Sequence, residues 1–175
     1  MTLPFFTVGH SNRSIDEFIV LLQSASVEGI VDVRRLPGSN RHPQFNEDAL
    51  GESLRHSGIR FDRVPELGGR RNVSKDVPFE TNAFWQNRSF HNYADYALSD
   101  EFSRGYDRLI GIGRERRTAV MCSEAVWWRC HRRIIADHLL ARGEEVYHVM
   151  NEGRENPAEL TSGAVVAGDT ITYPA

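Results

Sequence analysis

The stretch that decides the fold is residues 5–38, FFTVGHSNRSIDEFIVLLQSASVEGIVDVRRLPG. It opens with a short apolar run that ends at a glycine, which is typical of a buried strand. Ser14 and Glu17 then form a capping box, and apolar residues recur at helical spacing behind it. A second strand follows from Ile30 and is stopped at Pro37. The stretch therefore predicts a strand–helix–strand unit.

The same alternation continues along the chain. Further strands are predicted at residues 59–67, 118–123 and 145–150, and helices at residues 46–58, 93–98, 101–115 and 130–145. Repeated strand–helix units imply right-handed crossovers, so we expect a three-layer, Rossmann-like α/β fold with a mostly parallel sheet of about five strands. Residues 164–173, AVVAGDTITY, predict a small C-terminal β hairpin. We expect one domain over residues 1–175.

Composition excludes several classes of protein. The 175 residues carry a net charge of −3, which argues against a generally basic nucleic-acid-binding surface. No apolar run is long enough to cross a membrane, and the N-terminus does not resemble a signal peptide. Only two cysteines are present, so we expect free thiols and a cytoplasmic protein. Lys75 stands alone against twenty arginines; this ratio fits either bidentate anion recognition or a genomic preference for arginine.

Polar side chains follow four of the predicted strands. They are His10, Ser11, Asn12 and Arg13 after the first, Arg34, Arg35 and Ser39 after the second, Glu66, Arg70 and Arg71 after the third, and Cys122, Ser123 and Glu124 after the fourth. Ligands of open parallel sheets bind at the carboxyl ends of the strands. The sequence therefore predicts an anion-binding cleft at this edge. Its anion-binding candidates are Ser11, Asn12, Arg13, Arg34, Arg70, Arg71 and Arg132.

Three of the residues that follow the predicted strands are catalytic candidates. Cys122 ends a strand near arginines and a helix N-terminus, which would lower the pKa of its thiol; the alternative is a small buried hydrophobe. Glu124 is either a general acid–base or a carboxylate that orients Arg129 or Arg132. His10 is either an acid–base helper or a hydrogen-bonding loop residue.

Other conspicuous residues favour structural roles. The cysteines and His131 follow the spacing Cys-x7-Cys-His, which is not a zinc-knuckle pattern, so we predict no metal and no cofactor. Asp32, in a buried strand, needs a partner and is expected to hold a loop or an arginine. Trp127 and Trp128 either stack on a planar ligand or place one ring in the core.

Several motifs carry a resemblance to a known family. They are TVGHSNRSIDEF, VDVRRLPGS, PQFN, PELGGRR and CSEAVWWRCHRRIIADHL. Together they resemble the bacterial and archaeal family catalogued as domain of unknown function 488, over about residues 6–150, which leaves residues 151–175 as a tail. The matching positions are Gly9, His10, Ser11, Asp32, Arg34, Pro37, Glu66, Leu67, Gly68, Gly69, Cys122, Glu124, Cys130, His131 and Arg132. The resemblance implies an α/β sandwich and a motif-bearing cleft, without a reaction.

A second likeness concerns layout alone. VDVR on an early strand, followed later by strand, cysteine, loop and helix, is similar to rhodanese-like sulfurtransferases and cysteine phosphatases. In those proteins, backbone N–H groups of the cysteine loop wrap an anion. The loop here carries Glu124, bulky residues and no glycine, which suits a dianion poorly.

The sequence leaves a leading function and three alternatives. The leading hypothesis is a cytoplasmic enzyme that acts on a phosphate-bearing substrate, a nucleotide or nucleic acid. Cys122 or Glu124 would supply the chemistry and His10 would assist. The alternative is a non-catalytic nucleic-acid or ligand-binding module, in which arginines bind phosphate and a tryptophan stacks on a base. Rhodanese-like thiol chemistry is a weaker alternative, and a purely structural polar network is another.

Overall fold

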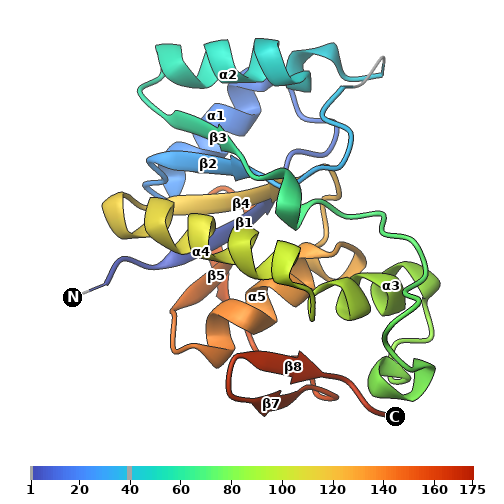
Figure 1. Cartoon of the computed structure of the whole chain (residues 1–175). Helices are drawn as coiled ribbons and strands as arrows, with labels where there is room; N and C mark the ends of the chain where they lie inside the picture. The colour runs from blue at the N-terminus through green and yellow to red at the C-terminus, as the bar shows by residue number, and fades with distance from the viewer. Residues whose placement is uncertain (1, 39–40) are drawn as a thin grey trace.

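A six-stranded sheet runs through the middle of the molecule in the computed structural model, which describes residues 2–38 and 41–175 (Figure 1). Its order is β3 (Arg60–Arg63), β2 (Gly29–Asp32), β4 (Thr118–Cys122), β1 (Phe5–Gly9), β5 (Val146–Asn151) and β6 (Arg154–Pro157). The first five are parallel, and β6 joins β5 antiparallel. The predicted, mostly parallel sheet is confirmed, with β6 as an unpredicted sixth strand.

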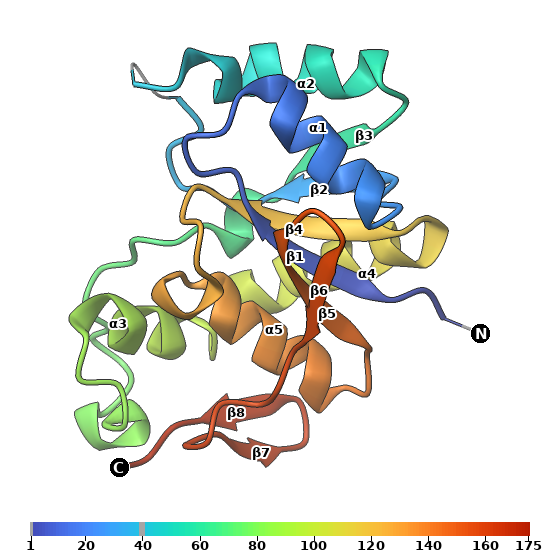
Figure 2. The same ribbon diagram turned by 180° about the vertical axis from the view of Figure 1, so that it is seen from behind.

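Helices cover both faces of this sheet, as Figures 1 and 2 show from opposite sides. The helices are α1 (Ile15–Ser24), α2 (Glu47–His56), α3 (Arg88–Tyr96), α4 (Asp100–Glu115) and α5 (Arg132–Ala141). Short 3-10 turns are η1 (Pro43–Phe45), η2 (Pro65–Leu67), η3 (Phe79–Asn82) and η4 (Trp127–Arg129). Side chains of α1 and α2 share one apolar core, and those of α3, α4 and α5 share the other. The predicted three-layer architecture is therefore confirmed.

Successive residues of β1 supply the two cores. Phe5 packs with α4 and α5, whereas Phe6 packs with α1 and α2, because neighbouring side chains of a strand point to opposite faces. Both phenylalanines are fully buried. The capping box at the start of α1 is also present, since the Ser14 hydroxyl accepts from the Glu17 N–H at 3.1 Å and Glu17 accepts from the Ser14 N–H at 2.9 Å.

Two helix starts differ from the prediction. The helix expected from residue 93 begins at Arg88, because the Asn87 side chain accepts hydrogen bonds from the N–H groups of the first turn. The helix expected from Cys130 begins two residues later, at Arg132. The η4 turn precedes it and leaves Cys130 with extended backbone angles. Ser39, expected at the carboxyl edge, lies outside the described residues.

The C-terminal residues pack onto the sandwich. The predicted hairpin is present as β7 (Val165–Ala167) and β8 (Thr170–Thr172). Ile171 and Tyr173 are buried in the core on the α5 side, and the Tyr173 hydroxyl donates to Asp137 at 2.7 Å. These contacts tie the chain end to α5. None of the described helices is long and apolar enough to cross a lipid bilayer.

Candidate active site

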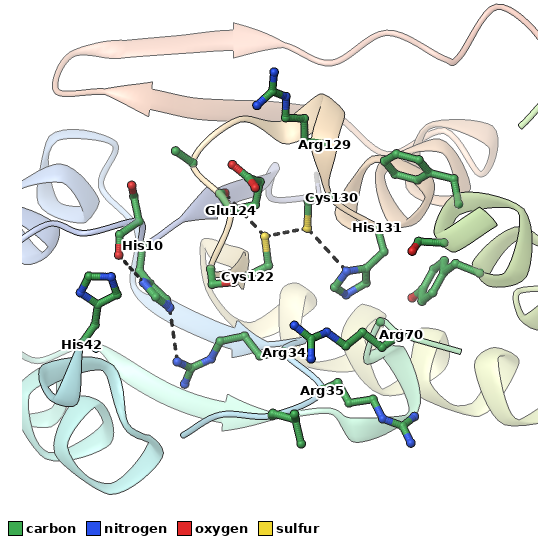
Figure 3. Close-up of a pocket in the computed structure, with 18 of the residues that line it drawn as sticks. His10, Arg34, Arg35, His42, Arg70, Cys122, Glu124, Arg129, Cys130 and His131 are labelled. Carbon is green, nitrogen blue, oxygen red and sulfur yellow. Dashed lines mark hydrogen bonds between the residues drawn. The ribbon is translucent and has the colours of Figure 1, made fainter. Parts of the chain in front are cut away.

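The carboxyl ends of the central strands lie level with one another. Gly9 pairs with Cys122, and Asp32 pairs with Met121. The pairing of β1 with β4 continues past both strands, since the N–H of His10 donates to the Cys122 carbonyl at 3.0 Å. A cleft of about 960 Å³ opens at this edge (Figure 3).

Most of the predicted site residues reach the cleft. Those that line it are His10, Ser11, Asn12, Arg34, Arg70, Cys122 and Glu124. Arg13, Arg71 and Arg132 are not part of its lining. Two lining residues, Ser11 with φ 54° and Arg70 with φ 56°, have left-handed backbone conformations. Such strain in residues other than glycine is often found at functional sites.

Arg13 and Arg71 hold the backbone instead of facing the cleft. Arg13 donates to the carbonyl groups of Gly9 at 2.5 Å and Met150 at 3.0 Å. Arg71 donates to the Gly68 carbonyl at 2.9 Å, and its guanidinium lies 3.8 Å from the centre of the Tyr96 ring. Their predicted role as anion ligands finds no support in this geometry.

Arg34 is held rigidly at the cleft wall. Its Nε and Nη2 donate to the Asp32 carboxylate at 2.8 to 3.1 Å, and Nη1 donates to the Phe45 carbonyl at 2.6 Å. Both members of this ion pair are almost wholly buried. The prediction that Asp32 holds an arginine is confirmed. Because Asp32 neutralises Arg34, this arginine shapes the cleft more than it adds net positive charge.

His10 lies between this ion pair and the cleft. Its ring stacks on Phe45 with centroids 4.2 Å apart, and Nδ1 donates to the Ser11 carbonyl at 2.8 Å. Nε2 therefore carries the lone pair and faces Arg34 Nη1 at 3.4 Å. Burial lowers the pKa of His10 to about 4, so the ring is neutral at pH 7. This geometry matches the predicted alternative of a hydrogen-bonding loop residue better than an acid–base helper.

Four other arginines give the cleft its charge. They are Arg35, Arg41, Arg70 and Arg129. Within the described part of the chain, no hydrogen bond or carboxylate engages their guanidinium groups, and Glu124 is the only carboxylate in the lining. Sequence reasoning did not include Arg35, Arg41 and Arg129 among the anion ligands, although all three sit in loops that follow β2 or β4.

The two cysteine sulfurs meet at the floor of the cleft. The Cys130 thiol donates to Cys122 Sγ, with the sulfur atoms 2.6 Å apart (Figure 3). Both thiols are free, both residues are buried, and both line the cleft. Sequence reasoning missed this contact because it placed Cys130 inside a helix. The extended backbone after η4 instead returns Cys130 to the end of β4.

Arg132 supplies a buried positive charge behind the sulfurs. Its side chain is fully buried, Nη2 donates to the Ala125 carbonyl at 3.1 Å, and Nε and Nη1 have no partner. No carboxylate of residues 2–38 and 41–175 lies within 4 Å of it. Burial alone would raise the pKa of Cys122, but the hydrogen bond from Cys130 and the charge of Arg132 outweigh it and lower that pKa. Burial and the neighbouring Cys122 raise the pKa of Cys130.

His131 lies next to the Cys130 sulfur. Its Nε2 donates to the Val33 carbonyl at 2.9 Å, so Nδ1 carries the lone pair, 3.5 Å from Cys130 Sγ. Burial lowers the pKa of His131 to about 4, which keeps the imidazole neutral. The ring fits there because Gly69 has no side chain: a Cβ at this position would lie 2.7 Å from Nδ1.

Glu124 and the two tryptophans depart from part of the prediction. The Glu124 side chain is exposed and forms no ion pair with Arg129 or Arg132, so the orienting role is wrong. Trp127 is half-buried and stacks on His148, with centroids 4.4 Å apart, and Trp128 is 46% exposed. Neither indole is fully in the core. In the described part of the chain, no group of three or more His, Cys, Asp or Glu side chains is arranged to hold a metal ion.

The comparison with protein families agrees with the motifs. The model of a family described as Domain of unknown function DUF488 matches residues 14–139 of the 175. The chain belongs to this family. The DUF488 match runs from the cap of α1 into α5 and includes both cysteines, His131 and Arg132. No curated protein and no solved structure matches the chain.

Proposed function

We propose that this protein is an enzyme that binds a phosphate-bearing substrate, a nucleotide or nucleic acid, in the arginine-lined cleft. In this proposal Cys122 is the candidate nucleophile. The observation that carries the proposal is Arg132, a fully buried cation that has no carboxylate partner among the described residues and whose charge acts on Cys122.

A buried guanidinium needs compensation. Transfer of a charge from water into a protein interior costs several kcal/mol unless an opposite charge or hydrogen bonds offset it. Among the described residues, the Arg132 guanidinium has one hydrogen bond, to the Ala125 carbonyl, and its Nε and Nη1 have no partner. A Cys122 thiolate would supply the missing negative charge. The same interaction favours the reactive form of the cysteine, because the thiolate is the nucleophile.

The arginines of the cleft can bind a phosphate-bearing substrate close to this nucleophile. A guanidinium binds a phosphate group with two parallel hydrogen bonds, more specifically than an ammonium group does. In Figure 3, Arg129 lies on one side of the sulfurs, and Arg34, Arg35 and Arg70 lie on the other. Arg35, Arg70 and Arg129 have no bound acceptor among the described residues. A phosphate group held between them would lie over Cys122.

Neighbouring residues complete the proposed site. Glu124 is the one carboxylate among the described lining residues, two positions after the nucleophile, and is the candidate general acid for the leaving group. His10, neutral and bonded to Ser11, supports Arg34 at the wall. The two free thiols suit a reducing compartment, so we place this activity in the cytoplasm.

A non-catalytic binding module is the second candidate. The half-exposed Trp128 favours it, because an exposed indole can stack on a base. The two candidates differ in what Cys122→Ser does. The enzyme proposal predicts that this variant binds substrate and loses turnover, whereas a binding module would be unaffected. Rhodanese-like sulfur transfer would give the same loss with a sulfur-donating anion as substrate.

Binding can be tested with inorganic phosphate and a panel of nucleotides. A ligand that binds only the folded chain raises its melting temperature. We expect Arg70→Ala and Arg129→Ala to weaken the best ligand by about tenfold each, the loss of one charge-assisted contact. Arg104→Ala removes an exposed arginine of α4 outside the cleft and serves as the charge-matched control. Equal binding by all three variants, or no shift with any phosphate compound, would contradict the proposal.

A further inference from the structure

The contact between the two sulfurs can do more than lower the pKa of one nucleophile. Cys122 Sγ and Cys130 Sγ are 2.6 Å apart, and a disulfide bond of about 2.05 Å requires only a small further approach. Both cysteines line the cleft, so a bound molecule can reach them. The remaining neighbours of Cys130 are His131 Nδ1 and the Arg132 N–H, each 3.5 Å from its sulfur.

We propose that Cys122 and Cys130 form a redox-active dithiol that reduces small disulfides bearing carboxylate groups. Cys122 is the attacking thiol and Cys130 is the resolving thiol. The inference rests on the proposed function in one respect, that Cys122 is a thiolate. It does not depend on the phosphate-bearing substrate.

The first step consumes the Cys122 thiolate. Its sulfur attacks one sulfur of the substrate disulfide, which breaks the substrate S–S bond and forms a mixed disulfide on Cys122. The other half of the substrate leaves as a thiolate and takes a proton from water. Arg132 favours this step because its buried charge stabilises the attacking thiolate before the bond forms.

The second step uses Cys130. Its sulfur attacks Cys122 Sγ, the mixed disulfide breaks, and the departing second substrate thiolate takes up the proton of the Cys130 thiol. The products are a Cys122–Cys130 disulfide and two substrate thiols, so two electrons move from the protein to the substrate. His131 can accept a hydrogen bond from the Cys130 thiol, because the Val33 carbonyl fixes the imidazole hydrogen on Nε2 and leaves the lone pair on Nδ1, 3.5 Å from the sulfur.

Formation of the mixed disulfide activates Cys130. In the reduced protein, burial raises the pKa of Cys130, and the hydrogen bond and negative charge of Cys122 raise it further. The mixed disulfide removes that negative charge. The charge and the N–H of Arg132, which favour a thiolate at Cys130, are then opposed by burial alone and no longer by Cys122. One buried arginine thus serves the two sulfurs in turn.

The charge of the cleft indicates the substrate class. Arg35, Arg70 and Arg129 line the cleft that holds the sulfurs, and no acceptor among the described residues engages their guanidinium groups. Guanidinium binds carboxylate in a bidentate geometry. A disulfide that carries carboxylates on both halves would be held with its S–S bond near the cleft floor. An uncharged disulfide would lack that attraction.

The test treats the reduced full-length chain with oxidised glutathione as the carboxylate-bearing probe. We expect wild type to release two glutathione thiols per chain and to yield a disulfide between the peptides of Cys122 and Cys130. The Cys130→Ser variant should release one thiol and retain glutathione on Cys122. The Cys122→Ser variant should release almost none. Hydroxyethyl disulfide, which is uncharged, should react with wild type about tenfold more slowly or worse.

The result for wild type is independent of whether either variant folds. A stable mixed disulfide on wild type, or no reaction with oxidised glutathione, would overturn the dithiol. Equal rates with the charged and the uncharged probe would overturn the substrate class. Iodoacetamide alkylation measured in parallel separates the two proposals. A Cys122 that alkylates as a thiolate but forms no internal disulfide refutes this inference alone. If the internal disulfide forms but no phosphate compound binds, the proposed phosphate-bearing substrate is refuted and the dithiol proposal stands.

Discussion

The Arg132 guanidinium donates a hydrogen bond to the Ala125 carbonyl across 3.1 Å, so a fully buried cation is tied to the loop that begins at Cys122. This bond fixes the charge relative to the end of β4. Proteins bury arginine without a carboxylate partner rarely, because the desolvation cost is large. The arrangement is therefore better explained by an anion that forms beside it than by stability.

Replacement of Arg132 separates stability from reactivity. We expect Arg132→Met to leave the free energy of unfolding unchanged or to raise it by about 1–3 kcal/mol, because an apolar side chain removes unpaired buried nitrogens. Alkylation of Cys122 at pH 7 should slow, because loss of the Arg132 charge raises the pKa of this thiol. Urea unfolding and iodoacetamide kinetics measure the two effects. A loss of more than about 3 kcal/mol would favour the structural network instead.

Asp32→Asn tests the ion pair that holds the cleft wall. Removal of the carboxylate leaves Arg34 buried and unpaired, so we expect a loss of about 3–5 kcal/mol in urea unfolding. Asp62→Asn disrupts the partly exposed pair with Arg60 and should cost less than about 1 kcal/mol. Similar losses of unfolding free energy in the two variants would show that the buried Asp32–Arg34 pair contributes no more to stability than the partly exposed pair.

Gly9 allows the loop after β4 to approach β1. A Cβ on Gly9 would lie 1.7 Å from the Glu124 carbonyl oxygen, so Gly9→Ala must displace the loop that carries the catalytic candidates. We expect a loss of about 1–3 kcal/mol or more, together with a changed Cys122 alkylation rate. Gly111→Ala is the control, because a Cβ there meets no atom within 4 Å. Its expected effect is neutral or stabilising by about 0.5–1 kcal/mol, since Gly111 lies in α4.

Buried histidines predict sensitivity to acid. Burial lowers the pKa of His138 from 6.5 to about 4, and the same direction applies to His10, His131 and His148. Between these pH values, the unfolded chain binds protons that the folded chain does not. The free energy of unfolding therefore has its full value above about pH 6.5. It falls as the pH drops towards 4, by about 1.4 kcal/mol per pH unit for each histidine.

His138 provides the variant for this prediction, since its Nε2 is buried without a partner and its ring packs on Phe102. His138→Leu should reduce the slope of the unfolding free energy against pH by the contribution of one histidine, about 1.4 kcal/mol per pH unit. The control is His56→Gln, which replaces an exposed histidine. An identical slope in wild type and His138→Leu would contradict the assignment.

Much of the architecture follows from local sequence. The apolar runs and the capping box at Ser14 are signals carried by neighbouring residues, and they predict the strand–helix units and the site at the carboxyl edge. The boundary of α5 does not follow in this way. Its apolar stripe predicts a helix but not where it starts, because the turn η4 at Trp127–Arg129 depends on packing against His148.

The error of two residues at α5 matters for the site. With Cys130 inside the helix, its sulfur would have no reason to meet Cys122. With Cys130 extended, the two sulfurs touch. The burial of Arg132 could not be predicted either, because a charged residue in the first turn of a helix is normally assigned to the surface. Arg41 and Arg129 join the cleft only through the paths of their loops.

The most direct test of the central claim is the pH dependence of Cys122 alkylation. Iodoacetamide reacts with the thiolate, so the rate at Cys122, followed by mass spectrometry of its peptide, reports the pKa of this thiol. We expect a midpoint below 9.0, the ordinary value, and a shift to higher pH in Arg132→Met. A midpoint at or above 9.0 in wild type, unchanged by Arg132→Met, would contradict the account.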